Sequence, residues 1–225
     1  SNSSIIRTLS IGVSGSGAFA VQLSVMGNAV ANSTSSVISG STVNAAQDIT
    51  LTAHDLAPTL IPFMDAVSSY IVDEETRNDL GESLADSPIN PTANILSLMV
   101  SVAGTGGVAV NGAFTGNVIT NTIEAQIAES NVTSAYGDIE LDTDSQSGIL
   151  SLTIGVAGSG AVAVNATGFG NVITNGVVSS ITDGSEVTTN AADGDIILTA
   201  DDLSQIRSAG ISVAATGGIA AGALI

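Results

Sequence analysis

Apolar and polar residues alternate along most of this chain, in short stretches separated by glycine, asparagine and aspartate. A period of two residues is typical of β-strands with one buried face. Gly, Asn and Asp mark turns, because they tolerate positive φ or bond their own backbone. In the best-preserved part of the chain the pattern predicts strands at Ile149–Val156, Ala161–Asn165, Asn171–Thr174, Val177–Ile181, Glu186–Thr189 and Asp195–Thr199. The turns expected between them include 158–160, 167–170, 183–184 and 193–195.

One small-residue run occurs four times. The copies are Ile11–Gln22 (IGVSGSGAFAVQ), Val100–Asn111 (VSVAGTGGVAVN), Ile154–Asn165 (IGVAGSGAVAVN) and Ile211–Gly222 (ISVAATGGIAAG). The glycine in register, at Gly17, Gly106, Gly160 and Gly217, recurs at intervals of 89, 54 and 57 residues. A period this long, in a chain rich in Val, Ile, Thr, Gly and Asn, indicates stacked repeats.

Further short motifs recur at the same intervals as these runs. A Gly-Asn pair follows three of them, a second asparagine comes four residues later, and an Asp-Ile pair then opens a strand at Asp48, Asp138 and Asp195. Asparagines stacked in register can hydrogen-bond from one repeat to the next. The sequence therefore predicts two structural asparagine ladders, formed by Asn28, Asn117 and Asn171 and by Asn32, Asn121 and Asn175.

These features predict an all-β fold, a right-handed parallel β-helix (β-solenoid) with a small helical insertion. The expected repeat units are about 5–99, 100–153, 154–210 and a partial 211–225, within a single solenoid segment spanning 1–225. Apolar residues at helical spacing in Leu60–Ala85 predict the insertion, at about 56–90. Two coils of about 27 residues or three of about 18 both fit the 54-residue unit. Because both termini fall inside a repeat, we expect a segment of a longer protein.

The net charge of the chain argues against two classes of binding partner. The chain has 21 acidic residues against three basic ones and a net charge of −18. This balance argues against binding to nucleic acid, which needs Lys and Arg to neutralise phosphates, and equally against an anionic membrane surface. There is no cysteine and hence no disulfide framework. The uncharged stretch Thr8–Gln47 is interrupted throughout by Gly, Ser, Asn and Thr, so we expect no membrane-spanning segment.

The repeat unit, with its small-residue β run, its G-N-x-I/V-x-N motif and its G-D-I-x-L-x-A/T motif, resembles the repetitive stalks of large bacterial filamentous adhesins. These are the filamentous-haemagglutinin-like and leukotoxin-type adhesins. The resemblance covers about 185 residues, all but the insertion. It implies β-helical repeats in a secreted protein at the bacterial cell surface.

The acidic residues are the strongest candidates for a metal site. Asp138, Asp142 and Asp144 follow one strand and its turn, and Asp195, Asp201 and Asp202 bracket the matching strand of the next repeat. Alternate residues of a strand share a face, and Ca²⁺ prefers six to eight oxygen ligands. The alternative is that these carboxylates simply lie on a solvated face. The sequence suggests no cofactor other than this Ca²⁺.

No catalytic constellation is visible. The single histidine, His54, corresponds in the other repeats to Asp144 and Asp201, so nothing repeats its imidazole. Arg7 and Arg207 fall in one column, where the two other repeats carry leucine. We therefore expect a non-enzymatic structural segment of an extracellular or cell-surface filament or adhesin, giving a rigid rod for attachment or for matrix and filament formation.

The expected partners are neighbouring repeats of the same long chain, further copies of it, or a cell-surface or matrix polysaccharide. The alternatives are a β-helical carbohydrate-active enzyme or a carbohydrate-binding module.

Overall fold

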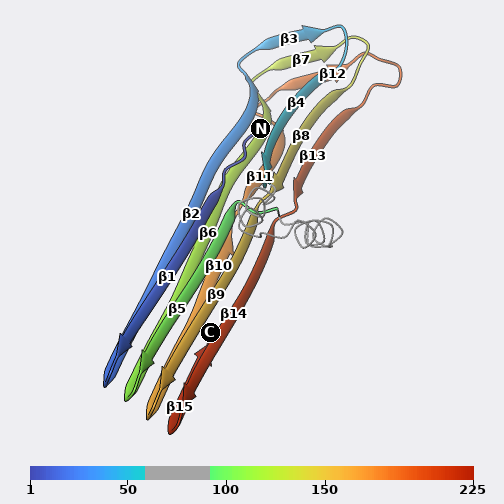
Figure 1. Cartoon of the computed structure of the whole chain (residues 1–225). Coiled ribbons are helices and arrows are strands. Elements are labelled where there is room, and N and C mark those ends of the chain that lie inside the picture. The colour runs from blue at the N-terminus through green and yellow to red at the C-terminus, as the bar shows by residue number, and fades with distance from the viewer. Residues whose placement is uncertain (59–91) are drawn as a thin grey trace, which may run out of the picture.

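The computed structural model describes residues 1–58 and 92–225, and within these ranges the chain is built of β-strands with no helix (Figure 1). This confirms the all-β prediction for the described part, while the predicted helical insertion at about 56–90 falls almost wholly outside it. The strands are β1 (Ile6–Ser16), β2 (Phe19–Ser39), β3 (Thr42–Ala45), β4 (Ile49–Leu56), β5 (Ile95–Thr105), β6 (Val108–Ala128), β7 (Asn131–Ser134), β8 (Ile139–Gln146), β9 (Gly148–Ser159), β10 (Val162–Ile173), β11 (Gly176–Thr182), β12 (Glu186–Thr189), β13 (Ile196–Asp202), β14 (Gln205–Thr216) and β15 (Ile219–Leu224).

Strands of successive repeats lie side by side in four parallel sheets. Their orders are β1-β5-β9-β14, then β2-β6-β10-β15 with β11 continuing β10 along β6, then β3-β7-β12, and finally β4-β8-β13. Each repeat passes once through each sheet. The expectation of two or three coils per unit is therefore wrong: the 54-residue unit makes a single long circuit, because its strands are up to 21 residues long.

The register between repeats changes only in turns. Strand β5 pairs with β9 at an offset of 54 residues, from Ile95 with Ile149 onwards. The offset is still 54 between β6 and β11, then 55 between β7 and β12 and 57 between β8 and β13. Turns thus absorb the extra residues of the third repeat, and the 57-residue interval follows. Between the first two repeats, β4 pairs with β8 at an offset of 90, so most of residues 57–92 have no counterpart in the second.

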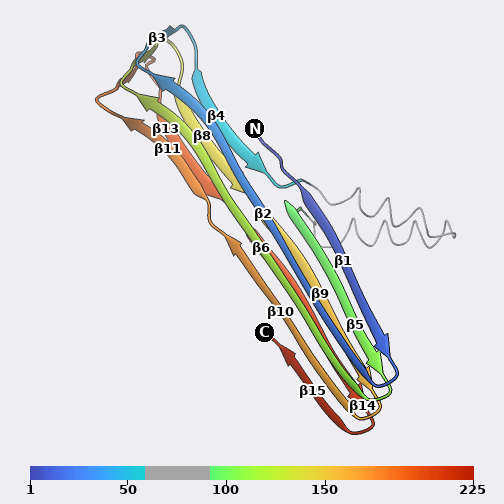
Figure 2. The same ribbon diagram turned by 90° about the vertical axis from the view of Figure 1, so that its left-hand side faces the viewer.

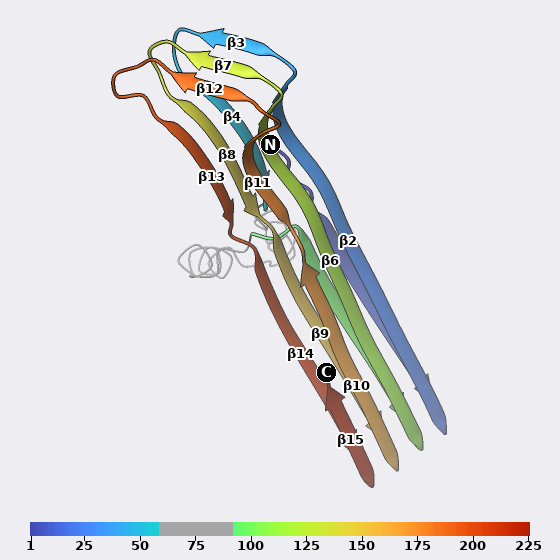
Figure 3. The ribbon, with the colours of Figure 1, turned by 180° about the vertical axis from the view of Figure 1, so that it is seen from behind.

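The strands form two halves, a long one and a short one (Figures 1 and 2), and these halves differ in composition. The half here called the blade comprises residues 6–30, 95–119, 149–173 and 206–225, where the first two sheets lie face to face. The half called the head comprises residues 31–56, 120–147 and 174–205, where the short strands β3, β7 and β12 cross the end of the molecule (Figure 3). Every acidic residue of the described chain lies in the head, and the only charges of the blade are Arg7 and Arg207.

The head has an ordinary apolar interior. Its buried cluster contains Leu51, Ile127, Val132, Ile139 and Leu141, and its outward positions carry residues such as Glu124 and Glu140. The expectation that alternating strands bury one face is met here in the usual way, with apolar side chains inward.

The blade has a largely polar interior. Between its two sheets lie isoleucines near the head, alanines near the tip, and a band of Ser, Thr and Asn side chains between them, among them Ser97, Ser101, Asn111 and Thr153. The aliphatic members of the alternation point outward. On the outer side of the β1-β5-β9-β14 sheet they form three rows, here called the aliphatic face: Leu9, Leu98, Leu152 and Ala209; Ile11, Val100, Ile154 and Ile211; Val13, Val102, Val156 and Val213.

At the tip of the blade the chain turns from one sheet into the other at the glycines of the repeated run. A Cβ on Gly160 would lie 2.2 Å from the carbonyl oxygen of Gly106, and one on Gly107 would lie 2.1 Å from that of Ala18. Cβ atoms on Gly106 and Gly217 would meet Gly17 and Gly160 in the same way. These contacts confirm the expected glycine column and explain it, because the backbone of the adjacent repeat occupies the space that a side chain needs.

Most predicted strands differ from the observed ones by one to three residues at an end, and one predicted turn is absent. Residues 167–170 (TGFG) continue strand β10 rather than forming a turn. Gly168 lies opposite Phe114 in the register, and the ring of Phe114 packs where a side chain of Gly168 would stand. The turn at Asp183-Gly184 does form, and both residues have positive φ, 54° and 70°.

Candidate functional site: polar ladders and acidic columns

The first asparagine column is a ladder of side-chain hydrogen bonds across the repeats. Asn28 Nδ2 donates to Asn117 Oδ1 at 2.7 Å, and Asn117 Nδ2 donates to Asn171 Oδ1 at 2.6 Å. The ladder continues in a 2.6 Å bond from Asn171 Nδ2 to Ser208 Oγ. Asn117 is fully buried. One amide carries both a donor and an acceptor, so identical asparagines can pair at the spacing of neighbouring strands.

In the second asparagine column, formed by Asn32, Asn121 and Asn175, the side chains bind the backbone of the adjacent repeat and not each other. The Oδ1 atoms of Asn121 and Asn175 accept the backbone N–H groups of Asn32 and Asn121, at 3.1 and 3.2 Å. Asn121 Nδ2 then donates to Asp55 Oδ2 and to Ser147 Oγ. These amides lie where strands β2 and β6 pass from blade to head, and they tie the sheet to the end of strand β4.

A third polar column was missed by sequence reasoning. Asn111 Nδ2 donates to Asn165 Oδ1 at 2.7 Å and to the carbonyl oxygen of Ser101 at 3.1 Å, while Ser101 Oγ donates to Asn111 Oδ1 at 2.6 Å. Gln22 occupies the same column in the first repeat. The signal was available, because these three residues end the quoted runs. The apolar and small residues around Gln22, Asn111 and Asn165 make each run resemble a purely apolar strand.

The aspartates that open the Asp-Ile pairs form a fourth ladder. Asp48 Oδ1 accepts the backbone N–H of Asp138 at 2.9 Å, and Asp138 Oδ1 accepts that of Asp195 at 2.8 Å. Asp138 and Asp195 are thus brought together. Each carboxylate acts here as an acceptor for the backbone of the next repeat, at the turn that leads into β8 or β13.

Of the other four aspartates proposed for calcium, Asp142, Asp144 and Asp201 lie on the outer side of β8 and β13. Asp202 lies opposite the buried Ser145, on the other side of the sheet. Asp144 lies opposite both His54 and Asp201 in the register, as the sequence predicted. His54 Nε2 is 3.5 Å from Asp142 Oδ2, Gln146 donates to Asp144 Oδ2 at 2.8 Å, and Asp202 Oδ1 accepts from the backbone of Ser204. Within residues 1–58 and 92–225 there is no group of three or more His, Asp or Glu side chains arranged to hold a metal ion. Calcium binding stays a prediction.

Asp55 is the one fully buried carboxyl among the residues that the structure describes. Its side chain is 1% exposed, its Oδ2 accepts from Asn121, and its Oδ1 has no hydrogen-bond partner. Burial raises the pKa of Asp55 above its ordinary value, and the neighbouring amides of Asn32 and Asn121 lower it by less. A buried acid with one unsatisfied oxygen costs stability when ionised.

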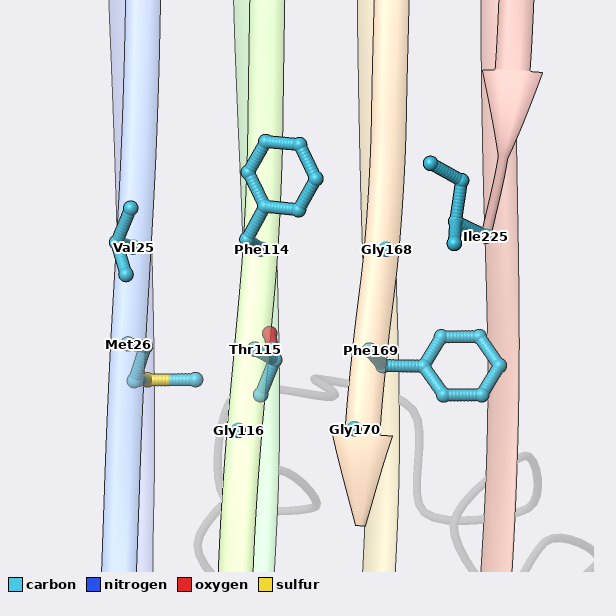
Figure 4. A pocket seen from close by; sticks show the side chains of 9 residues that line it. All are labelled: Val25, Met26, Phe114, Thr115, Gly116, Gly168, Phe169, Gly170 and Ile225. Atoms are coloured by element: carbon cyan, nitrogen blue, oxygen red, sulfur yellow. The ribbon is translucent and has the colours of Figure 1, made fainter.

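The outer side of the β2-β6-β10-β15 sheet carries a hollow of about 410 Å³. The hollow is also lined by Gly116, Gly168 and Gly170, which have no side chains. Figure 4 shows Phe114 on β6 and the ring of Phe169 extending from β10 past the end of β15, where it lies beside Gly210 of β14. The lining is almost wholly apolar and offers no acid, base or nucleophile.

No family model, no curated protein and no solved structure matches this chain. Among the residues that the structure describes, none forms a helix with the length and apolar character needed to cross a membrane. The arrangement therefore has to be interpreted from its own geometry, in which the buried polar groups join one repeat to the next.

Proposed function

We propose that this chain is a segment of a right-handed parallel β-solenoid and that it serves as a non-enzymatic structural element of an extracellular or cell-surface filament or adhesin of a bacterium. In this role it provides a rigid body for attachment or for matrix and filament formation. Its partners are the neighbouring repeats of a longer chain, further copies of the segment, or a surface polysaccharide.

The observation that carries this proposal is the register between repeats. Strand β6 pairs with β2 over 21 consecutive residues, and the same residue types meet at Gly27 and Gly116 and at Asn28 and Asn117. Strands β6 and β10 repeat the pattern one unit later, with Gly116 opposite Gly170 and Asn117 opposite Asn171. A unit that pairs with its own copy on either side can be extended without changing any contact, as in stacked-repeat proteins.

The strands at the edges of the sheets favour the addition of further repeats or copies along the stacking direction. Strands β1 and β14 are at the two edges of their sheet, and edge strands present unpaired N–H and C=O groups that can pair with another chain. A further repeat or a second copy would satisfy these groups in the geometry already used inside the molecule.

The proposal is tested by adding repeats. A second copy of residues 95–148 inserted after Gly148 keeps the register, because Ile95 and Ile149 occupy the same position. Each added copy should widen the molecule by about 4.8 Å along the stacking direction and leave its length along the strands unchanged. The unfolding temperature should also rise with repeat number. Small-angle scattering and thermal unfolding measure both.

Two results would contradict the proposal. If each added unit appeared in scattering as a separate globule, the repeats would not form a continuous solenoid. If the chain cleaved acidic or neutral polysaccharides, the β-helical carbohydrate-active enzyme would replace the structural role.

A further inference from the structure

A hollow of about 550 Å³ crosses the outer side of the β1-β5-β9-β14 sheet at the end of the blade nearest the head. It lies between two rows of side chains that the register sets straight across the four strands. The first, here called the arginine row, consists of Arg7, Leu96, Leu150 and Arg207, and the second is the first row of the aliphatic face, Leu9, Leu98, Leu152 and Ala209. The hollow is therefore a groove that runs across the strands.

The groove has the dimensions and the lining of a site for one linear apolar chain. Three strand spacings of about 4.8 Å give it a length of roughly 14 Å, and two residue steps of about 3.3 Å set the rows roughly 7 Å apart. Pockets for small molecules usually have volumes of about 300–1,000 Å³ and mostly apolar linings, with a few polar groups that fix the orientation of the ligand. The apolar lining here is mainly leucine: Leu9, Leu96, Leu98, Leu150 and Leu152.

The two ends of the arginine row carry the only charges of the blade, and both charges are positive. Arg7 is exposed, and it forms no hydrogen bond or ion pair with any residue that the structure describes. Arg207 differs, because its Nη2 donates to Gln205 Oε1 at 2.7 Å. The hollow of about 410 Å³ on the other side of the blade is also apolar, but no charged residue lines it. The groove thus combines an apolar floor with a cation whose donors are available to a ligand.

We propose that this groove binds a long-chain carboxylate, a free fatty-acid anion, with its head group on Arg7 and its alkyl chain laid across the leucines towards Ala209. The planar guanidinium matches a carboxylate in a bidentate pair of charge-assisted hydrogen bonds. Each methylene that the leucines remove from water adds to the affinity. Ala209 is the smallest side chain of the two rows, so it leaves room for the methyl end. This inference does not rest on the proposed function, since the groove lies on the face of the sheet and not on its stacking edges.

The geometry favours a single free amphiphile over a lipid bilayer. Two rows roughly 7 Å apart can flank one alkyl chain but not the two chains of a phospholipid side by side. Insertion of the blade into hydrocarbon would also leave the backbone groups of the edge strands β1 and β14 without partners, which a bilayer does not tolerate.

The first experiment tests the head group. Isothermal titration calorimetry of the full chain with dodecanoate, below the concentration at which it forms micelles, should show one saturable site. Arg7→Gln should weaken binding at least about 10-fold, because it removes the charge-assisted hydrogen bonds. Arg207→Gln is the matched control and should change the affinity by less than about 3-fold. Dodecyldimethylamine oxide, which has the same alkyl chain and no net charge, should bind at least about 10-fold more weakly than dodecanoate.

The second experiment tests the position of the alkyl chain. In the wild type, the affinity should rise about 10-fold from decanoate to dodecanoate, because two more methylenes leave water. Ala209→Phe fills the β14 end of the groove and should abolish this gain. Val164→Phe, on the outer side of β10, is the matched control and should preserve it. Far-UV circular dichroism checks that all four variants keep the fold.

Several results would overturn the proposal. Absence of saturable dodecanoate binding would do so, as would equal affinities for dodecanoate and the amine oxide, because the groove would then not select an anion. Binding to vesicles of anionic phospholipid, without binding to dodecanoate, would assign the groove to a membrane surface. Dodecanoate binding that appears only when residues 60–85 are deleted would assign it to that acidic segment of the chain itself. An unchanged gain in Ala209→Phe would contradict the position of the alkyl chain.

Discussion

Buried asparagines join adjacent repeats in the interior of the blade, where most proteins use apolar contacts. Asn117 accepts from Asn28 and donates to Asn171, so a single side chain joins three repeats. Asn111 donates to Asn165 of the next repeat and also to the backbone carbonyl of Ser101 in its own repeat. Each amide that is fully paired costs little to bury, whereas an amide that loses its partner retains the whole desolvation penalty.

Replacing Asn117 with alanine should therefore be costly. The change removes the acceptor of Asn28 and the donor of Asn171 in a buried position, and we expect the free energy of unfolding to fall by about 2–4 kcal/mol. Asn131→Ala, on the exposed side of β7, is the control and should change it by less than about 0.5 kcal/mol. Chemical denaturation measures both values. Equal effects of the two substitutions would mean that the ladder contributes nothing beyond strand propensity.

Asp55 predicts an unusual pH dependence. Its pKa in the folded protein is raised above the ordinary value of 3.8, chiefly by burial, so the folded state binds the proton more tightly than the unfolded state. The contribution of Asp55 to stability thus increases as the pH falls from neutral through its folded pKa, and at pH 7 the ionised carboxylate is destabilising.

The variant Asp55→Asn should therefore be more stable than the wild type at pH 7 and lose most of that advantage below about pH 4. Denaturation at both pH values tests this, with the exposed Asp193→Asn as a control for removing one negative charge from the head. A variant that is less stable than the wild type at pH 7 would show that ionised Asp55 is required by its amide neighbours.

At the scale of the strand, the sequence predicted where the strands lie in the chain better than it predicted where each strand begins and ends. The predicted strands Val177–Ile181 and Glu186–Thr189 lie within or coincide with β11 and β12. The pattern predicts two strands within residues 161–174, because Gly168 and Gly170 resemble a turn. In the structure Phe114 of the adjacent repeat covers Gly168 and β10 continues. Local turn chemistry could not show this, since the covering side chain comes from 54 residues earlier in the chain.

The glycines themselves divide into two classes that mutation should separate. Gly160→Ala places a Cβ about 2.2 Å from the carbonyl oxygen of Gly106, so the turn at the tip of the blade must move. We expect a loss of about 1–3 kcal/mol in the free energy of unfolding, as for other overpacked sites.

Gly170→Ala is the matched control for this substitution. It lies within β10 with no atom within 4 Å of the added Cβ, and it should be neutral or slightly stabilising, because glycine is a weak strand former. Thermal unfolding of the two variants measures the difference. Similar losses would show that the glycine column reflects strand preference and not contact between repeats.

At the scale of the whole molecule, the period of the sequence predicted the parallel stacking, but it could not predict which face of the blade lies inside. An alternation with a period of two defines two faces and leaves their assignment open. In the head the apolar set is buried, as with Leu141. In the blade the polar set is buried, as with Ser101, whose hydroxyl accepts from Ser24 of the adjacent repeat and donates to Asn111 of the facing sheet and is thereby satisfied.

The acidic residues, confined to the head, set the response of the whole molecule to ions. Asp144 and Asp201 lie opposite each other on adjacent strands, and like charges in that position are destabilising. Sodium should relieve the repulsion by screening. Calcium bound between the columns would add a link that only the folded state can form, and would raise the unfolding temperature further by mass action.

We therefore predict a higher unfolding temperature in calcium than in sodium at equal ionic strength, and a lower one in chelator. Asp201→Asn should abolish most of the difference between calcium and sodium, whereas Asp193→Asn, which lies outside the paired columns, should preserve it. Identical unfolding temperatures in calcium and sodium would show that the carboxylates are only screened. In that case the head would be held by the backbone bonds of Asp48 and Asp138, which need no ion.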